Sequence, residues 1–161
     1  MKYYVKCNNV NDSKELHFRD ENDELLYIVK KESLYKLRAI EILDPDYKPK
    51  YNVNFNPLKF KGRYQVRDVN NSEVITISTG LHLLHKIVIA GKKLVCKANL
   101  FKIKYWLYDD DKVIARLQII KKDDERYFEI NLEKTDKIIY AIALYIIAQA
   151  QRINYVRKWV K

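Results

Sequence analysis

The sequence predicts a mostly β protein, namely a closed antiparallel barrel of about twelve strands around one hydrophobic helix near the C-terminus. Three observations support this fold class. Apolar and polar residues alternate up to about residue 133, short turns rich in Asp and Asn interrupt the alternation, and one long apolar run breaks the period. The 161 residues fit a single domain over residues 1–161.

Segments that alternate between apolar and polar residues are expected to be strands, because successive side chains of a strand point to opposite faces. Most of these segments are rich in the β-branched and aromatic residues that strands favour. The expected strands are Met1–Lys6, Leu16–Phe18, Leu25–Val29, Leu37–Ile42, Tyr51–Phe55, Tyr64–Val66, Val74–Ile77, Lys86–Ile89, Leu94–Cys96, Phe101–Tyr108, Val113–Ile120 and Tyr127–Leu132.

Short polar segments between the strands are expected to be turns. Asp and Asn dominate them because their side chains bond to the turn backbone and tolerate left-handed conformations. A spacing of about ten residues between turns is typical of an antiparallel sandwich or barrel. The expected turns are Asp20–Glu24, Asp44–Asp46, Asp68–Glu73, Ala90–Lys92, Asp109–Asp111 and Asp123–Glu125.

The single helix is expected over about residues 136–151, with Thr135 or Asp136 as its N-cap. Its apolar run, Ile138–Ala148, is shorter than the roughly 17–25 residues that span a bilayer. Because the run is apolar on every side, we expect it to be buried, and a closed barrel around it achieves this most simply. Residues 153–160 alternate again, and we expect a last strand or a capping tail there.

Glycine and cysteine usage exclude several function classes. The three glycines are too far apart to form a Gly-rich phosphate loop. Cys7 and Cys96 are expected to be buried free thiols, since a disulfide or a reactive nucleophile requires a context that the sequence does not show. With a strand at the N-terminus in place of a signal peptide, we expect a cytoplasmic protein.

The sequence predicts no catalytic residue, no cofactor and no metal site. His82 and His85 have no Cys or acidic partner at a zinc-ligand spacing, so a turn or packing role is expected. The acidic turns lack the calcium-loop pattern, and no serine lies in a nucleophile motif. A non-enzymatic protein is therefore expected.

Basic residues are concentrated in one part of the chain. The formal net charge is +10, and residues 51–107 contain ten Lys and Arg but only two acidic residues. In strands, Lys102 and Lys104 are expected to share one face, with Phe101, Ile103 and Tyr105 on the other. The candidate residues for an anionic ligand are Lys59, Lys61, Arg63, Arg67, Lys86, Lys92, Lys93, Lys102 and Lys104.

Three functions remain compatible with this basic segment. A positive surface attracts anionic phospholipid or phosphoinositide-like headgroups at a membrane. It also attracts nucleic acid, and interleaved aromatic residues suit stacking on bases, although no RNA-binding motif is present. The third hypothesis is a structural protein-interaction module with no ligand, whose lysines form a solvated outer face. We expect the first, with nucleic acid as the alternative.

The order of these elements resembles the tubby C-terminal-like superfamily, in particular its LURP-one-related branch, which is distantly similar to phospholipid scramblases. The resemblance covers nearly the whole chain: strand–acidic turn–strand units, then Tyr127–Ile130, then Thr135 and Asp136 before the helix. It implies a twelve-stranded barrel around a hydrophobic C-terminal helix. Tubby proteins bind phosphoinositides on a basic face, so the resemblance implies a cytoplasmic protein that is peripheral at the membrane. The cysteine-rich segment of scramblases is missing, and scramblase activity is not implied.

Overall fold

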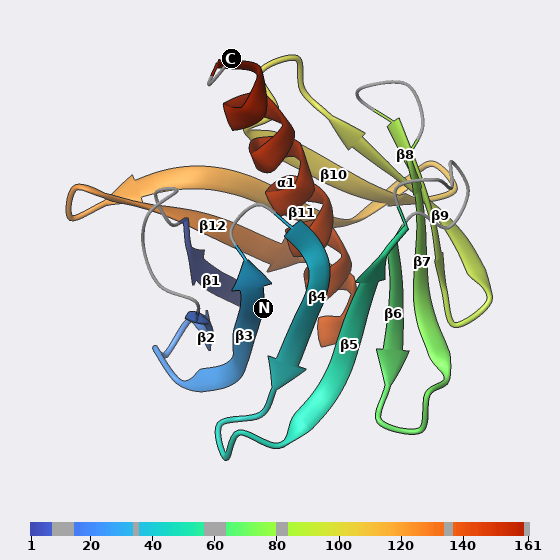
Figure 1. Ribbon diagram of the computed structural model, residues 1–161. Helices are drawn as coiled ribbons and strands as arrows, with labels where there is room; N and C mark the ends of the chain where they lie inside the picture. The colour runs from blue at the N-terminus through green and yellow to red at the C-terminus, as the bar shows by residue number, and fades with distance from the viewer. Residues whose placement is uncertain (8–14, 34–35, 57–63, 80–83, 134–136, 160–161) are drawn as a thin grey trace.

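The computed structural model describes residues 1–161 except 8–14, 34–35, 57–63, 80–83, 134–136 and 160–161, and it leaves the side chains of 31–33, 36–39, 79 and 150–159 undescribed. Twelve strands and one helix are present (Figure 1). They are β1 (Lys2–Lys6), β2 (Glu15–Asp20), β3 (Leu25–Ser33), β4 (Lys36–Leu43), β5 (Pro49–Phe55), β6 (Tyr64–Asp68), β7 (Glu73–Thr79), β8 (Leu84–Ile89), β9 (Lys92–Ala98), β10 (Lys104–Asp109), β11 (Lys112–Lys122), β12 (Glu125–Leu132) and α1 (Ile138–Trp159).

The strands form one closed antiparallel barrel, which confirms the predicted fold class. Each strand pairs with its neighbours in sequence, and β1 pairs with β12 to close the barrel, with Lys2 opposite Asn131 and Lys6 opposite Tyr127. In such a meander the turns alternate between two ends. The β2–β3, β4–β5 and β6–β7 turns lie at one end, where α1 also begins, and the β9–β10 turn lies at the other, where α1 ends (Figure 1).

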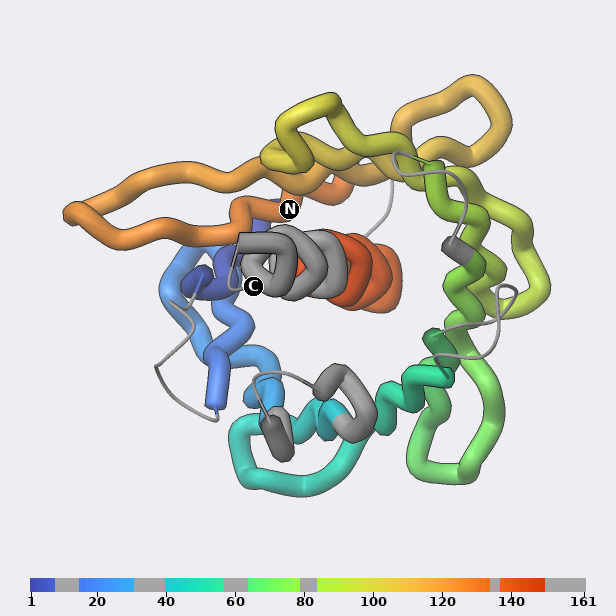
Figure 2. The backbone as a smooth tube through the Cα atoms, turned by 45° about the horizontal axis from the view of Figure 1, so that its top comes forward, coloured from blue at the N-terminus to red at the C-terminus, as the bar shows by residue number. Residues whose placement is uncertain are grey.

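Helix α1 lies inside the barrel, nearest to β10, β11 and β12 (Figure 2). Every residue from Ala141 to Ala148 is buried, as the all-round apolar run predicts. The ring of Tyr145 meets Phe18 and Phe128 edge-on, with centroids 6.1 and 5.9 Å away. Such edge-to-face contacts stabilise the helix against β2 and β12.

The helix extends further than the sequence predicts. It begins at Ile138 but continues to Trp159, eight residues beyond the expected end at 151. A strand or capping tail over residues 153–160 is therefore wrong for 153–159. No Gly or Pro follows Ala148, so nothing in the local sequence ends the helix. The expected N-caps, Thr135 and Asp136, lie outside the described residues.

Three hairpin turns share one construction that explains their acidic first residue. The Oδ1 atoms of Asp20, Asp44 and Asp68 each accept the backbone N–H groups of the second and fourth residues after them, at 2.9–3.0 Å. The third residue after each is left-handed: Asp23 (φ 65°), Tyr47 (φ 63°) and Asn71 (φ 62°). The predicted Asp-based turns are therefore confirmed at these positions.

Strand β10 begins later than expected. The alternation predicts a strand from Phe101, but residues 99–103 form a turn, and β10 starts at Lys104. The side-chain oxygen of Asn99 accepts the N–H groups of Ile103 and Lys104 at 2.9 and 3.0 Å, and Lys102 is left-handed with φ 55°. Asn99 thus takes the role that Asp has in the other turns, and local hydrogen bonding overrides the alternation.

Candidate functional site

The β9–β10 turn, residues Asn99–Ile103, presents apolar side chains to solvent, and we call it the apolar turn. Leu100 is 76% exposed, Phe101 78% and Ile103 42%. The side-chain oxygen of Asn99 holds the turn backbone by two hydrogen bonds. The hydroxyl of the buried Tyr105 donates a further hydrogen bond to the backbone carbonyl of Lys102 at 3.1 Å. The exposed apolar side chains are thus presented by a backbone that is already fixed.

Exposed lysines lie on the outer side of β8, β9 and β10. Lys86, Lys97 and Lys104 lie toward the apolar turn, whereas Lys93 lies at the other end of β9, beside the β8–β9 turn. Outward positions of adjacent strands alternate between lysine and apolar residues, with Lys97 opposite both Leu84 and Trp106. The Nζ atom of Lys97 lies 4.8 Å from the ring centroid of Tyr108. We call this surface the lysine face, and it consists of Lys86, Lys93, Lys97 and Lys104 with the apolar side chains between them.

The lysine face has no acidic neighbours in sequence. Between Glu73 and Asp109 the chain contains six lysines and no Asp or Glu. Among the described residues, no lysine of this face forms an ion pair. Its charges are therefore available to an external anion.

The structure does not bring all the sequence-predicted candidates together. Lys86, Lys93 and Lys104 belong to the lysine face, and Lys102 lies in the apolar turn. Lys92 instead pairs with Asp109 in the neighbouring hairpin, and that hydrogen bond raises the pKa of Lys92. Arg67 donates to the backbone oxygen of Asn71 at 3.4 Å. Lys59, Lys61 and Arg63 lie outside the described residues.

The predicted strand arrangement around Lys102 is wrong. Phe101 and Ile103 are expected on the face of a strand opposite to Lys102 and Lys104, but residues 99–103 form a turn, and both side chains are exposed there. The exposure of Leu100 and Phe101 is the feature that the alternation missed. The sequence signal for this turn is Asn99, because an Asn side chain can accept backbone N–H groups a few residues later and turn the chain before the next strand.

A shallow hollow of about 390 Å³ borders the lysine face between β10, β11, β12 and β1. Glu129 lies in it and accepts hydrogen bonds from Gln118 at 2.7 Å and Tyr4 at 3.2 Å, with Lys2 3.8 Å away. Arg116 pairs with Glu133 at 2.6 Å. Of the three cationic residues that line this hollow, Lys2 and Arg116 have acidic partners, and Lys104 forms no ion pair with any described residue.

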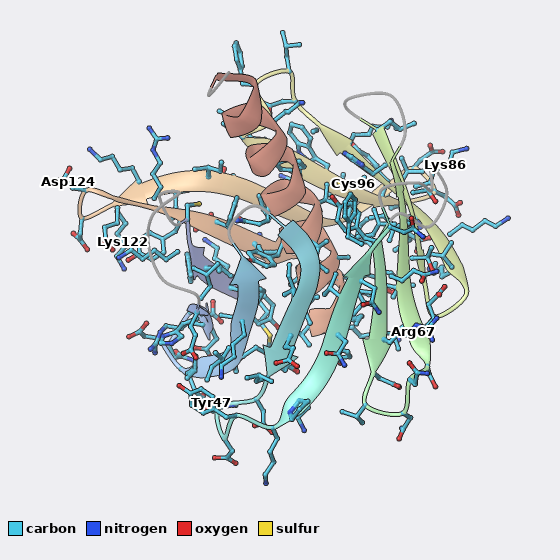
Figure 3. The ribbon with its side chains drawn as sticks, viewed as in Figure 1. Tyr47, Arg67, Lys86, Cys96, Lys122 and Asp124 are labelled. Atoms are coloured by element: carbon cyan, nitrogen blue, oxygen red, sulfur yellow. The ribbon has the colours of Figure 1, made fainter. Side chains whose placement is uncertain are left out.

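Behind the lysine face, His85 and Cys96 face the barrel interior from β8 and β9. Burial, together with the charge of Lys102, lowers the pKa of His85 from 6.5 to about 4. Burial raises the pKa of Cys96 to about 12. Both cysteines are buried free thiols, as predicted, and Figure 3 shows Cys96 inside the barrel and Lys86 outside. His82 lies outside the described residues.

The opposite end of the barrel carries the contrary charge. The turn segments 20–24, 44–50, 68–73, 89–92 and 109–112 contain eleven acidic residues and four lysines. We call this the acidic end. The acidic end and the lysine face thus carry opposite charges, a difference that the net charge of +10 conceals.

Among the described residues, no group of three His, Cys, Asp or Glu side chains is arranged to hold a metal ion. Within the same residues, no helix is both long enough and apolar enough to cross a membrane.

The architecture defines a class: a closed twelve-stranded antiparallel β-barrel with a helix inside it. Among solved structures, it is similar to the X-ray structure of a protein from Arabidopsis thaliana, AT5G01750, with a TM-score of 0.60 and 15% sequence identity. The match covers 95% of this chain and 91% of that chain, so the likeness extends over the whole barrel. No protein-family model and no curated protein matches the sequence.

Proposed function

We propose that the protein is a non-enzymatic module that docks to anionic phospholipid surfaces through the apolar turn and the lysine face. The observation that carries the proposal is the pair Leu100 and Phe101, both more than three-quarters exposed on a fixed turn that also contains Lys102. Apolar side chains flanked by cations are what an interfacial membrane site requires.

Both contributions are needed for stable docking. Full burial of a Leu or Phe side chain contributes about 1.5–3 kcal/mol, and each lysine near an anionic surface contributes about 1 kcal/mol. Leu100 and Phe101 together with three or four lysines thus provide about 6–10 kcal/mol, a favourable free energy of the same order as the cost of losing rotational and translational freedom on a membrane.

The charge polarity supports one orientation. An anionic surface attracts the lysine face and repels the acidic end, so the apolar turn points toward the membrane. Exposed apolar side chains that would otherwise face water are then buried in the interface.

We further infer that the chain is a tubby-like domain related to the LURP-one branch. The whole-length likeness to the Arabidopsis barrel supports the relation at the level of fold. A phosphoinositide-like headgroup is then one anionic ligand to test.

Vesicle flotation tests the proposal directly. The protein is mixed with vesicles of phosphatidylcholine alone, of phosphatidylcholine with phosphatidylserine, and of phosphatidylcholine with a phosphoinositide. We expect binding only to the two anionic compositions, decreasing as salt increases. Equal binding to all three compositions, or binding to none, would contradict the proposal.

The same protein preparation separates the alternatives. Trp106 and Tyr108, with Lys97 above the Tyr108 ring, would also suit stacking on single-stranded bases. Tight oligonucleotide binding without vesicle binding would favour that function. If charge reversal at Lys102 and Lys104 changes neither binding, the structural-module hypothesis remains.

A further inference from the structure

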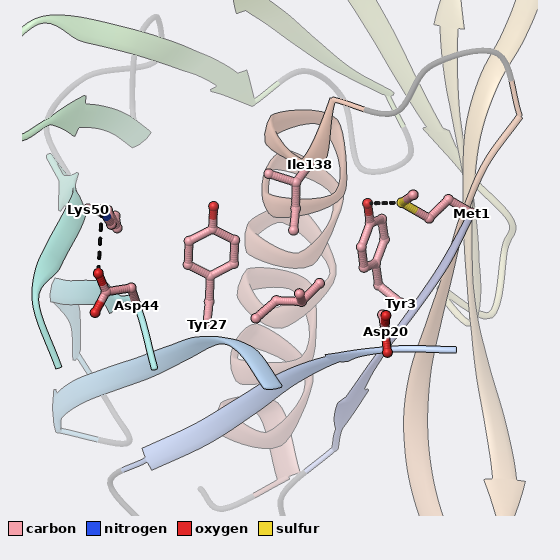
Figure 4. A pocket seen from close by; sticks show the side chains of 8 residues that line it. Met1, Tyr3, Asp20, Tyr27, Asp44, Lys50 and Ile138 are labelled. Carbon is pink, nitrogen blue, oxygen red and sulfur yellow. Dashed lines mark hydrogen bonds and ion pairs between the residues drawn. The ribbon is translucent and has the colours of Figure 1, made fainter. Parts of the chain in front are cut away.

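A second hollow, of about 410 Å³, lies at the acidic end, far from the apolar turn along the barrel axis. It is bordered by β1, β2, β3 and the β4–β5 hairpin on the barrel wall and by Ile138, the first residue of α1 (Figure 4). Its volume is in the range of small-molecule sites, and barrel mouths are frequent positions for such sites.

The lining combines apolar surface with aromatic rings. Leu26 and Ile138 supply aliphatic surface, and Tyr3 and Tyr27 supply two rings. Tyr27 is half-buried, its hydroxyl points into the hollow (Figure 4), and it forms no hydrogen bond with any described residue. The hydroxyl of Tyr3 already donates to the sulfur of Met1. The hollow thus offers one available hydroxyl and ring surfaces that attract cations.

One carboxylate in the hollow lacks a compensating cation. Asp44 pairs with Lys50 at 3.4 Å, and the N-terminal amine of Met1 donates to the carbonyl of Leu132 at 3.3 Å. Asp20 has no cation within ion-pair distance among the described residues. Its Oδ1 atom is occupied by backbone N–H groups, while Oδ2 has only the Asn22 amide at 3.4 Å.

We propose that this hollow binds a small organic cation, an ammonium group on a compact apolar body. The ammonium pairs with the Oδ2 atom of Asp20, and the apolar body lies against Leu26, Tyr27 and Ile138. The Tyr27 hydroxyl bonds to any polar group at the far end of the ligand. The two cations of the lining already have partners, because Lys50 pairs with Asp44 and the N-terminal amine donates to the carbonyl of Leu132. A cationic ligand would therefore pair with Asp20, an anionic one would be repelled by it, and a neutral one would gain no charge pairing. The site does not depend on membrane docking, which uses the other end.

The test uses three matched probes, phenethylamine, phenethyl alcohol and phenylacetate, which share a ring and differ in charge. Isothermal titration is expected to show binding of the amine, binding of the alcohol about tenfold weaker, and none of the carboxylate. Asp20→Asn is expected to weaken amine binding about tenfold, because the ammonium group loses its charged partner.

Asp68→Asn is the matched control, because Asp68 makes the same turn contacts as Asp20 but does not line the hollow. Asn retains a side-chain oxygen, so both variants are expected to keep the turn, as checked by circular dichroism. Equal affinity for amine and alcohol, equal loss in the Asp20 and Asp68 variants, or no amine binding at millimolar concentration would overturn the proposal.

Discussion

The β6–β7 turn at the acidic end and the apolar turn at the other end are built in a similar way. In each, the side-chain oxygen of the first residue, Asp68 or Asn99, accepts two backbone N–H groups, and the fourth residue is left-handed. The apolar turn is one residue longer. Since the first residue sets the backbone, the exposed residues of each turn are free to differ: Val69 and Asn70 in one, Leu100 and Phe101 in the other. Similar scaffolds thus present different side chains: one apolar residue and one amide at the acidic end, and two large apolar residues at the other end.

The strongest test of this contrast removes the apolar side chains from one end at a time. Leu100→Ser with Phe101→Ser is expected to weaken binding to anionic vesicles about a hundredfold, because two apolar side chains no longer enter the interface. Flotation measures the change. The control is Val69→Ser, since Val69 is also exposed (64%) but lies at the acidic end. A similar loss in both variants would show that the ends do not differ.

Acidification is expected to destabilise the barrel through His85. Its pKa of about 4 in the folded protein is lower than the value near 6.5 in the unfolded chain, so the unfolded state binds a proton first as the pH falls. The free energy of unfolding therefore decreases from about pH 6.5 down to about pH 4, by roughly 2 kcal/mol at pH 5.

Urea denaturation of the wild type and of His85→Leu over this pH range measures that contribution. The variant is expected to lack this part of the pH dependence, although carboxylates still contribute at lower pH. Parallel curves for the two proteins would contradict this prediction, because they would mean that the pKa of His85 is the same in the folded and unfolded states.

Exchanging the first residue of the two turns separates charge from backbone geometry. Asn99→Asp keeps the acceptor oxygen but adds a negative charge beside Lys102, so vesicle binding is expected to weaken about fivefold to tenfold with little change in stability. The reciprocal variant, Asp68→Asn, is expected to leave vesicle binding unchanged. A large loss of stability in Asn99→Asp would show that the turn does not accept either residue.

The smallest expected effects on vesicle binding come from single lysine substitutions, and they compare two lysines, Lys104 and Lys92, that sequence analysis does not distinguish. Lys104→Ala is expected to weaken vesicle binding about fivefold, because one cation of the lysine face is lost. Lys92→Ala is expected to have no measurable effect, since Lys92 is paired with Asp109 at the acidic end. Flotation at low salt compares the two variants, and equal losses would refute a localised face.

The fold could be predicted from the sequence because its signals are local. Each strand expected before residue 133 overlaps an observed one, since period-two patterning and Asp-based turns act over a few residues. The alternating pattern gave a wrong prediction in two places: where a side chain turned the backbone, and where no residue ended the helix. Asn99 turned the chain at residues predicted to be strand, and α1 continued through residues 153–159.

The candidate site was less accessible to sequence analysis. The lysine-rich segment was recognised, but which lysines share a surface depends on strand order and register. Lys86 and Lys97 lie on adjacent strands and point outward together, whereas Lys92 points to a neighbouring hairpin. The pairing of Lys92 with Asp109 joins residues seventeen positions apart, which no local pattern specifies.

The seam between β1 and β12 has a consequence for how the protein is made. All other strand pairs form between neighbours in sequence, so hairpins can assemble in order as the chain leaves the ribosome. The seam partner β12 and then α1 emerge after all the other strands. Until then, the nascent sheet is open and its inner apolar side chains are exposed to other chains. We therefore expect aggregation to occur chiefly during synthesis, and chains truncated before β12 to be the species that chaperones bind.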